Sequence, residues 1–276
     1  MRKIFILLCC ISLFACHKSQ QENVNQVAKI VEFQDHALSL FTVAYDVMAK
    51  IDSPSTVSMF QNCMEVVWID SLFNDGNGIE AFLTFHNYDS FSSKYLYGFD
   101  KKLRKGLLYI EVNHSLSNQD VTGQIAIVDS IQYNSGYYIK KMKQLNGSLF
   151  FSRNGANSWV VSLPQMKYQS GLQLGMMSFE GEINLSSGSS NGLIGATLSM
   201  KGSSKGVVSS DFKTEIKAPL EINFSKECSG MYRVGEQQVQ FKDDTWTVNY
   251  NAFNTGNCDR YIKLEWGRQE YFRPMY

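Results

Sequence analysis

Acidic side chains are the first candidates for chemistry in this chain of 276 residues. Glu180 and Glu182 alternate onto one face of an expected strand, and Asp243 and Asp244 open a turn before Trp246. Two carboxylates held about 5–10 Å apart in a cleft can hydrolyse a glycosidic bond. Residues at i and i+2 reach that separation on any solvated strand, so the spacing alone does not predict a hydrolase.

A serine motif is the second candidate. Gly188, Ser190 and Gly192 match the Gly-x-Ser-x-Gly pattern of serine hydrolases, whose serine lies on a strained strand-to-helix turn. Here the motif falls in a polar loop between two expected strands, which favours a chance match. We therefore predict no catalytic residue.

Metal-binding patterns are also weak. Neither His86 nor His114 has a partner at i+2, i+3 or i+4 that would make a metal pair, and the chain has no His-Glu-x-x-His or Cys-x-x-Cys motif. We expect His36 to be solvated, and His86 and His114 to follow strands. One turn is rich in oxygen ligands but lacks the spacing of an EF-hand loop. It contains Asp70, Asn74, Asp75 and Asn77. We predict neither a metal nor a cofactor.

Aromatic residues form the last candidate site. Tyr88, Phe91, Tyr95, Tyr97 and Phe99 cluster in a serine-rich stretch. Tyrosines on a flat sheet can stack on sugars or line a partner interface, although they also simply cover sheets. We name Tyr88, Tyr95 and Tyr97 as candidate ligand-facing aromatics.

The amino-terminal segment has the pattern of an export signal. Arg2 and Lys3 precede an apolar run over residues 4–14, which is too short to span a bilayer. Residues 13–16, Leu-Phe-Ala-Cys, resemble the bacterial lipobox, in which the cysteine is acylated and the chain is cut before it. We expect residues 1–15 to be removed and Cys16 to carry the lipid. The alternative is an ordinary signal for soluble secretion.

The mature charge balance argues against nucleic-acid binding. Without Arg2 and Lys3, 24 basic and 26 acidic residues remain. A nearly neutral surface gives no electrostatic reason to bind nucleic acid. No apolar run after residue 16 is long enough to span a membrane either, so the lipid is the expected membrane anchor.

Three cysteines remain after the signal and Cys16, and an exported protein meets an oxidising compartment. Cys228 and Cys258 both lie beside expected turns, and we predict a disulfide between them, with Cys63 as a buried thiol. The alternative is three unpaired, buried cysteines.

Two segments are expected ahead of the strands. Residues 16–25 are polar and without periodicity, which indicates a tether. Residues 26–51 carry apolar side chains at steps of three and four, which predicts an amphipathic helix ending before Ser53 and Pro54. Its apolar stripe is expected to pack on its own sheet, although it could face a membrane or a partner.

The rest of the chain predicts β structure. Short runs rich in β-branched and aromatic residues are separated by turn residues such as Asn146-Gly147 and Asn154-Gly155. Trp246, Val248 and Tyr250 alternate with polar residues, as on a sheet with one buried face. Expected strands cover residues 64–69, 79–85, 107–112, 125–133, 137–142, 148–152, 158–163, 176–185, 193–200, 211–216, 237–242, 245–250 and 261–266. We predict a single mainly β domain over residues 26–276, a large antiparallel meander forming a curved sheet, a sandwich or an open barrel.

Several segments resemble a family of uncharacterised lipoproteins from Bacteroidota. They are residues 62–67 (Asn-Cys-Met-Glu-Val-Val), 99–108 (Phe-Asp-Lys-Lys-Leu-Arg-Lys-Gly-Leu-Leu), 216–228 and 250–259, the last with Gly-Asn-Cys-Asp. The chain departs from the family at Lys101, where glycine is usual. It also lacks a cysteine between Phe85 and Asp100 that many members carry, which leaves Cys63 without an obvious partner. The resemblance implies an outer-membrane or surface lipoprotein with no assigned activity.

Three functions follow as hypotheses. The first is an envelope-anchored lipoprotein with a non-enzymatic binding or structural role at the outer membrane or cell surface, with an envelope protein or a glycan as partner. The second is a carrier that holds a lipid or another hydrophobic ligand in a cavity under the curved sheet. The third is a hydrolase.

Overall fold

The computed structural model of the chain describes the backbone of residues 2–73, 76, 78–90, 94–134, 143–186, 192–253, 258 and 261–275. Side chains are described from residue 20 onward, except those of Asp89 and Asn134. Within these residues one helix precedes a series of antiparallel strands. The prediction of a mainly β chain with one N-terminal helix and a large antiparallel sheet is confirmed.

The helix is α1 (Arg2–Asp52). The strands are β1 (Met64–Asp70), β2 (Ile79–Phe85), β3 (Tyr88–Asp89), β4 (Lys94–Tyr95), β5 (Leu103–Val112), β6 (Thr122–Ile127), β7 (Ile131–Asn134), β8 (Lys143–Asn146), β9 (Ser148–Arg153), β10 (Ser158–Ser170), β11 (Gln173–Ser186), β12 (Thr197–Val208), β13 (Ser210–Asn223), β14 (Met231–Phe241), β15 (Asp244–Asn249), β16 (Tyr261–Trp266) and β17 (Gln269–Pro274).

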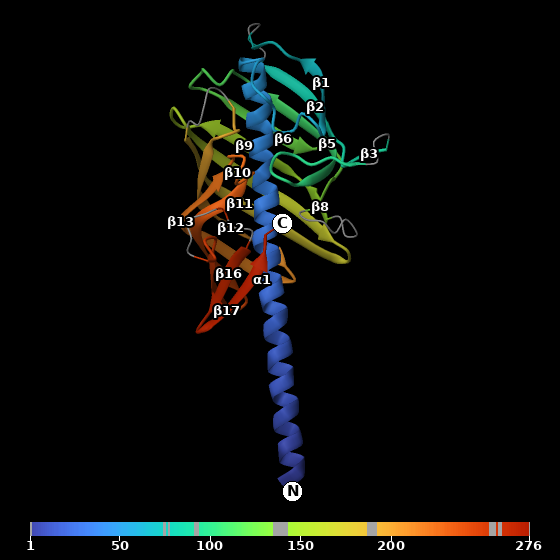
Figure 1. The fold of residues 1–276 in the computed structure, drawn as a ribbon, viewed down its shortest axis with the longest axis vertical. Helices are drawn as coiled ribbons and strands as arrows, with labels where there is room; N and C mark the ends of the chain where they lie inside the picture. The colour runs from blue at the N-terminus through green and yellow to red at the C-terminus, as the bar shows by residue number, and fades with distance from the viewer. Residues whose placement is uncertain are drawn as a thin grey trace.

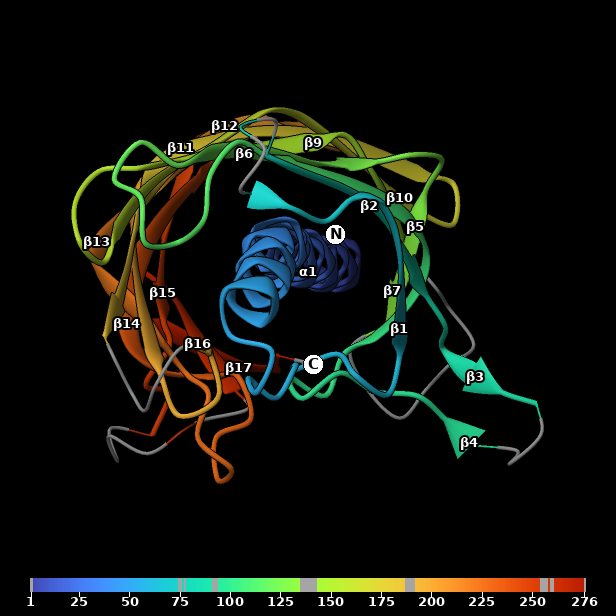
Figure 2. The same cartoon turned by 90° about the horizontal axis from the view of Figure 1, so that it is seen from above.

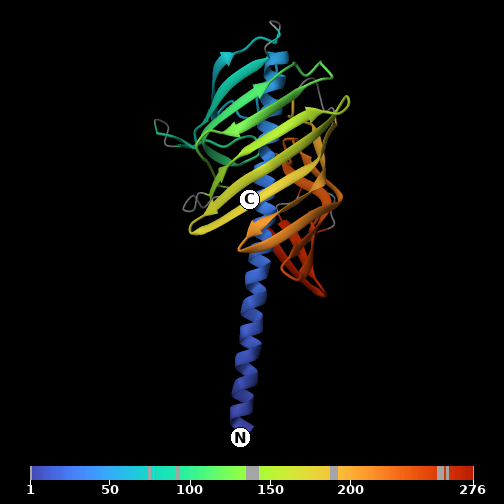
Figure 3. The same cartoon turned by 180° about the vertical axis from the view of Figure 1, so that it is seen from behind.

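Fifteen of these strands form one sheet that follows chain order from β1 at one edge to β17 at the other. Strands β7 and β8 pair beside β5 and β10, while β3 and β4 form a separate two-stranded sheet. The large sheet rolls around α1, so that the helix runs through its centre (Figures 1 and 2). Seen from behind, the long strands cross α1 diagonally (Figure 3). We call the sheet together with the helix inside it the roll.

The enclosed position of α1 differs from the predicted packing of one apolar stripe. Apolar side chains from Val24 to Ala49 are buried around the whole helix, as expected of a helix surrounded by protein. Polar residues of α1 are buried as well, including Gln34, Asp35 and His36. The prediction that His36 is solvated is therefore wrong, because a sheet that surrounds the helix leaves it no solvent-facing side.

The amino-terminal boundary also differs from the prediction. The tether expected over residues 16–25 is helical and continuous with α1. Val24 is completely buried, so the packed body begins before residue 26. No proline or glycine occurs between residues 16 and 52 to interrupt the helix, and Pro54 follows its end.

The strands show the expected alternation but are longer than expected. On β15, Trp246 and Val248 are buried, while Thr245 and Thr247 face outward. The expected strand 125–133 is interrupted between Ile127 and Ile131, and residues 193–196 precede β12 rather than belonging to it. The sequence did not predict β8 or β17, and the expected strand 137–142 lies outside the described residues.

The two ends of the roll differ. At the end from which the start of α1 emerges (Figure 1), residues at the β10–β11 and β14–β15 turns bond to the helix, and we call this end the proximal rim. Gln173 Nε2 donates to Gln26 Oε1 (2.7 Å), and Lys242 Nζ donates to Asn23 Oδ1 (3.1 Å). The opposite end, where α1 finishes at Asp52, we call the mouth.

Candidate functional site

The mouth contains a pocket of about 780 Å³, within the range of typical ligand pockets. Its wall is built by the end of α1, the segment after β1, the β5–β6 connection and the β9–β10 turn. The lining residues are Tyr45, Ile51, Asp52, Ser71, Leu72, Phe73, His114, Ser115, Leu116, Ser117, Asn118, Arg153, Ala156, Asn157, Trp159 and Leu185.

Arg153 joins two sides of this pocket. Its Nε donates to the carbonyl of Gly155 (2.9 Å), and its Nη1 donates to the carbonyl of Asn118 (2.7 Å). Further guanidinium hydrogen bonds reach the carbonyls of Leu116 and Ala156. Because these bonds use most of its donors, Arg153 fixes the two loops and keeps few N–H groups with which to bond a ligand.

Asp52 holds the β5–β6 connection from the helix side. The backbone N–H of Leu116 donates to Asp52 Oδ2 at 2.6 Å. Burial raises the pKa of Asp52, and backbone hydrogen bonds from Leu116 and Ser117 oppose that rise. The acidic group is therefore part of the pocket wall, and its hydrogen bonds order the loop.

The lining also contains uncharged polar side chains and aromatic rings. Ser117 and Asn118 are exposed at the rim of the pocket, and Tyr45 packs edge-on against Trp159 with ring centroids 6.0 Å apart. Hydroxyl and amide groups beside partly buried aromatic rings can hydrogen-bond and pack against a neutral polar ligand. The lining can therefore hold a polar ligand through hydrogen bonds and ring contacts.

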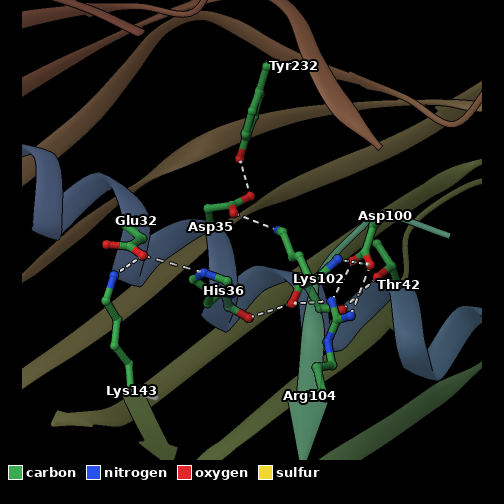
Figure 4. Close-up of polar contacts among 10 residues, drawn as sticks. Glu32, Asp35, His36, Thr42, Asp100, Lys102, Arg104, Lys143 and Tyr232 are labelled. Atoms are coloured by element: carbon green, nitrogen blue, oxygen red, sulfur yellow. Dashed lines mark hydrogen bonds and ion pairs between the residues drawn. The ribbon is translucent and has the colours of Figure 1, made fainter. Parts of the chain in front are cut away.

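A second polar cluster lies inside the roll between α1 and the sheet (Figure 4). Asp35 accepts hydrogen bonds from Lys102 Nζ (2.6 Å) and from the Tyr232 hydroxyl (2.9 Å). Asp100 accepts two bonds from the Arg104 guanidinium, at 2.5 and 3.1 Å. Although burial alone would raise it, the Arg104 charge holds the pKa of Asp100 below its ordinary value.

His36 completes this cluster beside a third ion pair. Lys143 pairs with Glu32, and His36 Nε2 lies 3.9 Å from Glu32 Oε1. Burial, together with the charges of Lys102, Lys143 and Arg104, lowers the pKa of His36 well below its ordinary value.

The ion pairs of the cluster balance one another. The acids Glu32, Asp35 and Asp100 each face a cation, while His36 is neutral at pH 7. A balanced, hydrogen-bonded cluster joins α1 to the sheet and contributes no unpaired reactive group.

The tyrosines predicted from the sequence lie apart from both features. Tyr88 and Tyr95 face each other across the β3–β4 pair with ring centroids 5.2 Å apart, each about 44% exposed. Tyr97 forms an isolated bridge to Leu103 and is half-buried. Phe91 lies outside the described residues. The three candidate tyrosines therefore do not gather in a pocket with the mouth residues.

The acidic candidates remain on the surface. Glu180 and Glu182 are exposed on the outer face of β11, and Asp244 bonds to Asn23 at the proximal rim (3.3 Å). Gly188 and Ser190 of the serine motif lie outside the described residues, as do Asn74, Asp75 and Asn77, while Gly192 is described. Where side chains are described, no cluster of three or more His, Cys, Asp or Glu could hold a metal ion.

The cysteines behave differently from one another. A disulfide joins Cys228 and Cys258, whose Cα atoms are 5.3 Å apart. Cys63 is buried and free, and burial raises its pKa to about 11. The backbone of Cys16 lies in α1, ahead of the described side chains.

The residues that build the mouth were missed at the sequence level. Arg153 precedes the predicted Asn154-Gly155 turn, but nothing nearby indicates that it reaches residues 116–118. Among the described residues, no helix has the length and apolar character needed to cross a membrane. No family model, curated protein or solved structure matches this chain.

Proposed function

We propose that this protein is an envelope-anchored lipoprotein with a non-enzymatic binding role, attached to the outer membrane or cell surface through a lipid on Cys16. One observation carries the proposal: the packed body of the roll begins at Val24, and the mouth pocket lies at the far end of the same helix. A membrane attached at residue 16 then leaves the mouth facing away from it.

The ligand proposed for the mouth is a neutral polar segment of the envelope, of which a glycan is the best fit. Serine and asparagine side chains line the pocket, while Arg153 and Asp52 are already bonded to the pocket's own loops. Arg153 and Asp52 carry opposite charges, so together they give a strongly charged ligand little net charge to bind. A protein segment is the alternative partner.

The carrier hypothesis receives less support. It requires an apolar cavity beneath the helix, and α1 occupies the space inside the roll. A cavity between α1 and the sheet beside Asp35 and Tyr232 has a volume of about 20 Å³, enough for a single water molecule. An acyl chain could enter only if α1 moved out, so we do not propose this function.

The anchor is tested by labelling. Cells that express the wild-type chain are grown with radioactive palmitate, and the label should appear on the mature protein. Cys16→Ala should abolish it, whereas Cys10→Ala, a matched change in the expected signal segment, should leave it intact. A mature protein that remains unlabelled would contradict the proposal.

The role of the mouth is tested by filling the pocket. The full mature chain is incubated with purified cell-wall glycan and with an envelope protein extract, and bound material is measured. Ser117→Arg, at the pocket, should reduce binding at least tenfold, while Ser203→Arg, on the exposed outer face of β12, should not. Equal binding by both variants would contradict a role for the mouth.

A further inference from the structure

Four exposed apolar side chains form a patch at the proximal rim. Leu172, in the β10–β11 turn, is fully exposed, and Leu174 is 68% exposed. Met176 and Val207 are direct cross-strand neighbours on β11 and β12, and about 40% of each is exposed. We call Leu172, Leu174, Met176 and Val207 the rim patch. Isolated exposed apolar residues need no explanation, but four together on one hairpin and its neighbour do.

The rim patch lies at the end of the roll from which α1 emerges. Gln173, between the two leucines, bonds to Gln26 (2.7 Å) and to Lys29 (2.5 Å) on the helix. Cys16 precedes Gln26 by ten residues, a helical rise of about 15 Å. In Figure 3 the β10–β11 hairpin, drawn in yellow, accordingly turns near the proximal rim. A membrane attached at residue 16 would therefore face this end.

Three lysines and two aspartates lie around the rim patch, an excess of one positive charge. Lys167 lies opposite Met176, while Lys205 and Lys213 lie opposite each other one step further along the strands, and all three are exposed. Asp211 lies opposite Val207, and Asp129 lines a surface hollow together with Leu174, Met176 and Val207 of the patch. Three lysines beside an apolar patch match a surface with an apolar interior and anionic headgroups.

The exposed tip of the hairpin at Leu172 favours lipid over a protein partner. Leu172 occupies the tip of a hairpin whose preceding residue, Gly171, has a φ of 62°. A leucine at a convex tip presents little area to a second protein, yet it can enter the interface of a bilayer. We infer that the rim patch is a second membrane contact, in which Leu172 and Leu174 enter the lipid surface and Lys167 and Lys205 face anionic headgroups. This inference rests on the proposed anchoring through Cys16.

Vesicle binding tests the inference without the lipid anchor. The full mature chain with Cys16→Ser is sedimented with vesicles of phosphatidylethanolamine and phosphatidylglycerol, and with vesicles of phosphatidylcholine alone. We expect binding to the anionic vesicles that weakens as salt is added. The double variant Leu172→Asp/Leu174→Asp should bind at least tenfold more weakly. Replacing Lys167 and Lys205 by serine should weaken binding about fivefold for each lysine.

A matched control separates the rim patch from general stickiness. Phe150 and Val160 are exposed apolar residues on the outer faces of β9 and β10, nearer the mouth. Phe150→Asp/Val160→Asp should leave vesicle binding unchanged. Thermal unfolding of each variant should show that the roll is intact.

The outcomes distinguish this inference from the proposed function. If the Cys16→Ser chain does not bind anionic vesicles, or if the control pair weakens binding equally, the rim patch is not a membrane contact, even when palmitate labels the wild type. If the leucine variant changes self-association but not vesicle binding, a second copy of the chain occupies the patch and the inference is wrong. Vesicle binding without palmitate labelling would retain the contact and reject the anchor.

Discussion

Asp46 is a single residue whose ionisation should affect stability. It accepts hydrogen bonds from the Ser58 hydroxyl (2.5 Å) and the Met59 N–H (2.9 Å), so it holds the chain that follows α1. Burial raises its pKa from 3.8 to about 6, despite these bonds and the charge of Lys50. The folded protein therefore binds a proton at Asp46 more tightly than the unfolded chain does.

The raised pKa of Asp46 fixes the direction of a pH effect. Its contribution to stability is complete below the unfolded value of 3.8 and is lost as pH rises through about 6. A difference of about two pKa units corresponds to roughly 3 kcal/mol. In urea unfolding, the free energy of unfolding of the wild type should decrease between pH 4.5 and pH 7.5. Asp46→Asn should remove much of this decrease. Asp120→Asn, at an exposed turn, should keep the full decrease.

Arg104 is the second residue with a specific expected cost. It is buried, makes two bonds to Asp100, and contacts Ser39 on α1 at 3.3 Å. Arg104→Ala leaves the Asp100 carboxylate without its partner, which should reduce the free energy of unfolding by about 3–5 kcal/mol. Denaturant unfolding measures the loss.

An exposed ion pair provides the control for Arg104. Lys217 and Glu215 lie 2.5 Å apart, but both side chains are largely in solvent. Lys217→Ala should cost less than about 1 kcal/mol. Equal losses for the two variants would mean that the buried pair contributes no more than a surface pair.

At the scale of elements, the Cys228–Cys258 disulfide joins the segment before β14 to the segment before β16. It closes a loop with a sequence separation of 30 residues, for which the chain-entropy argument gives about 3–4 kcal/mol. Cys228→Ser/Cys258→Ser should lower the denaturation midpoint accordingly. Calorimetry of the variant and of the reduced wild type should agree, since both lack the same link.

The thiol of Cys63 offers an independent check on the Cys228–Cys258 disulfide. It is buried and its pKa is raised to about 11, so a thiol reagent at pH 8 should react with it only after unfolding. When the mature, unreduced protein is unfolded, the reagent should detect one thiol beyond residue 16, that of Cys63. Two additional thiols before reduction would show that the disulfide is absent.

At the scale of the whole molecule, α1 and the sheet share one core. Val24, Val27, Ile30, Val31 and Phe33 are all buried inside the roll. Each contributes about 1.5–3 kcal/mol on burial, and a domain of this kind is stable by only about 5–15 kcal/mol. The sheet should therefore not remain folded without the first turns of the buried helix.

Truncation tests this dependence. A chain that begins at Gln20 retains every described buried side chain and should unfold at the wild-type temperature, in one transition. A chain that begins at Gln34 should lack the near-ultraviolet circular dichroism of a packed core. A folded sheet in the shorter chain would mean that α1 is an accessory to the roll rather than its centre.

Much of this organisation could be predicted from local patterns. The period-two alternation at Trp246 and Val248 gave the buried face of β15, and Asn154-Gly155 marked the β9–β10 hairpin turn. The pair Asn146-Gly147 is not a hairpin turn, because β8 and β9 on either side of it both pair with β10. Each of these signals lies within a few residues of the feature it describes, so one sequence is enough to predict them.

The tertiary structure alone decided that α1 runs inside the sheet and where the mouth lies. Asp35 is hydrogen-bonded to Tyr232 at a sequence separation of 197 residues, and Gln34 to Gln237 at a separation of 203. No local pattern links either pair. His36 was expected to face solvent. Its burial was not predictable, because the partners of the buried polar residues of α1 lie on strands far along the chain. Arg153 likewise acquires its role only when the β9–β10 turn closes against residues 116–118. Such contacts depend on how far the sheet curves, which is set by the packing of the whole core.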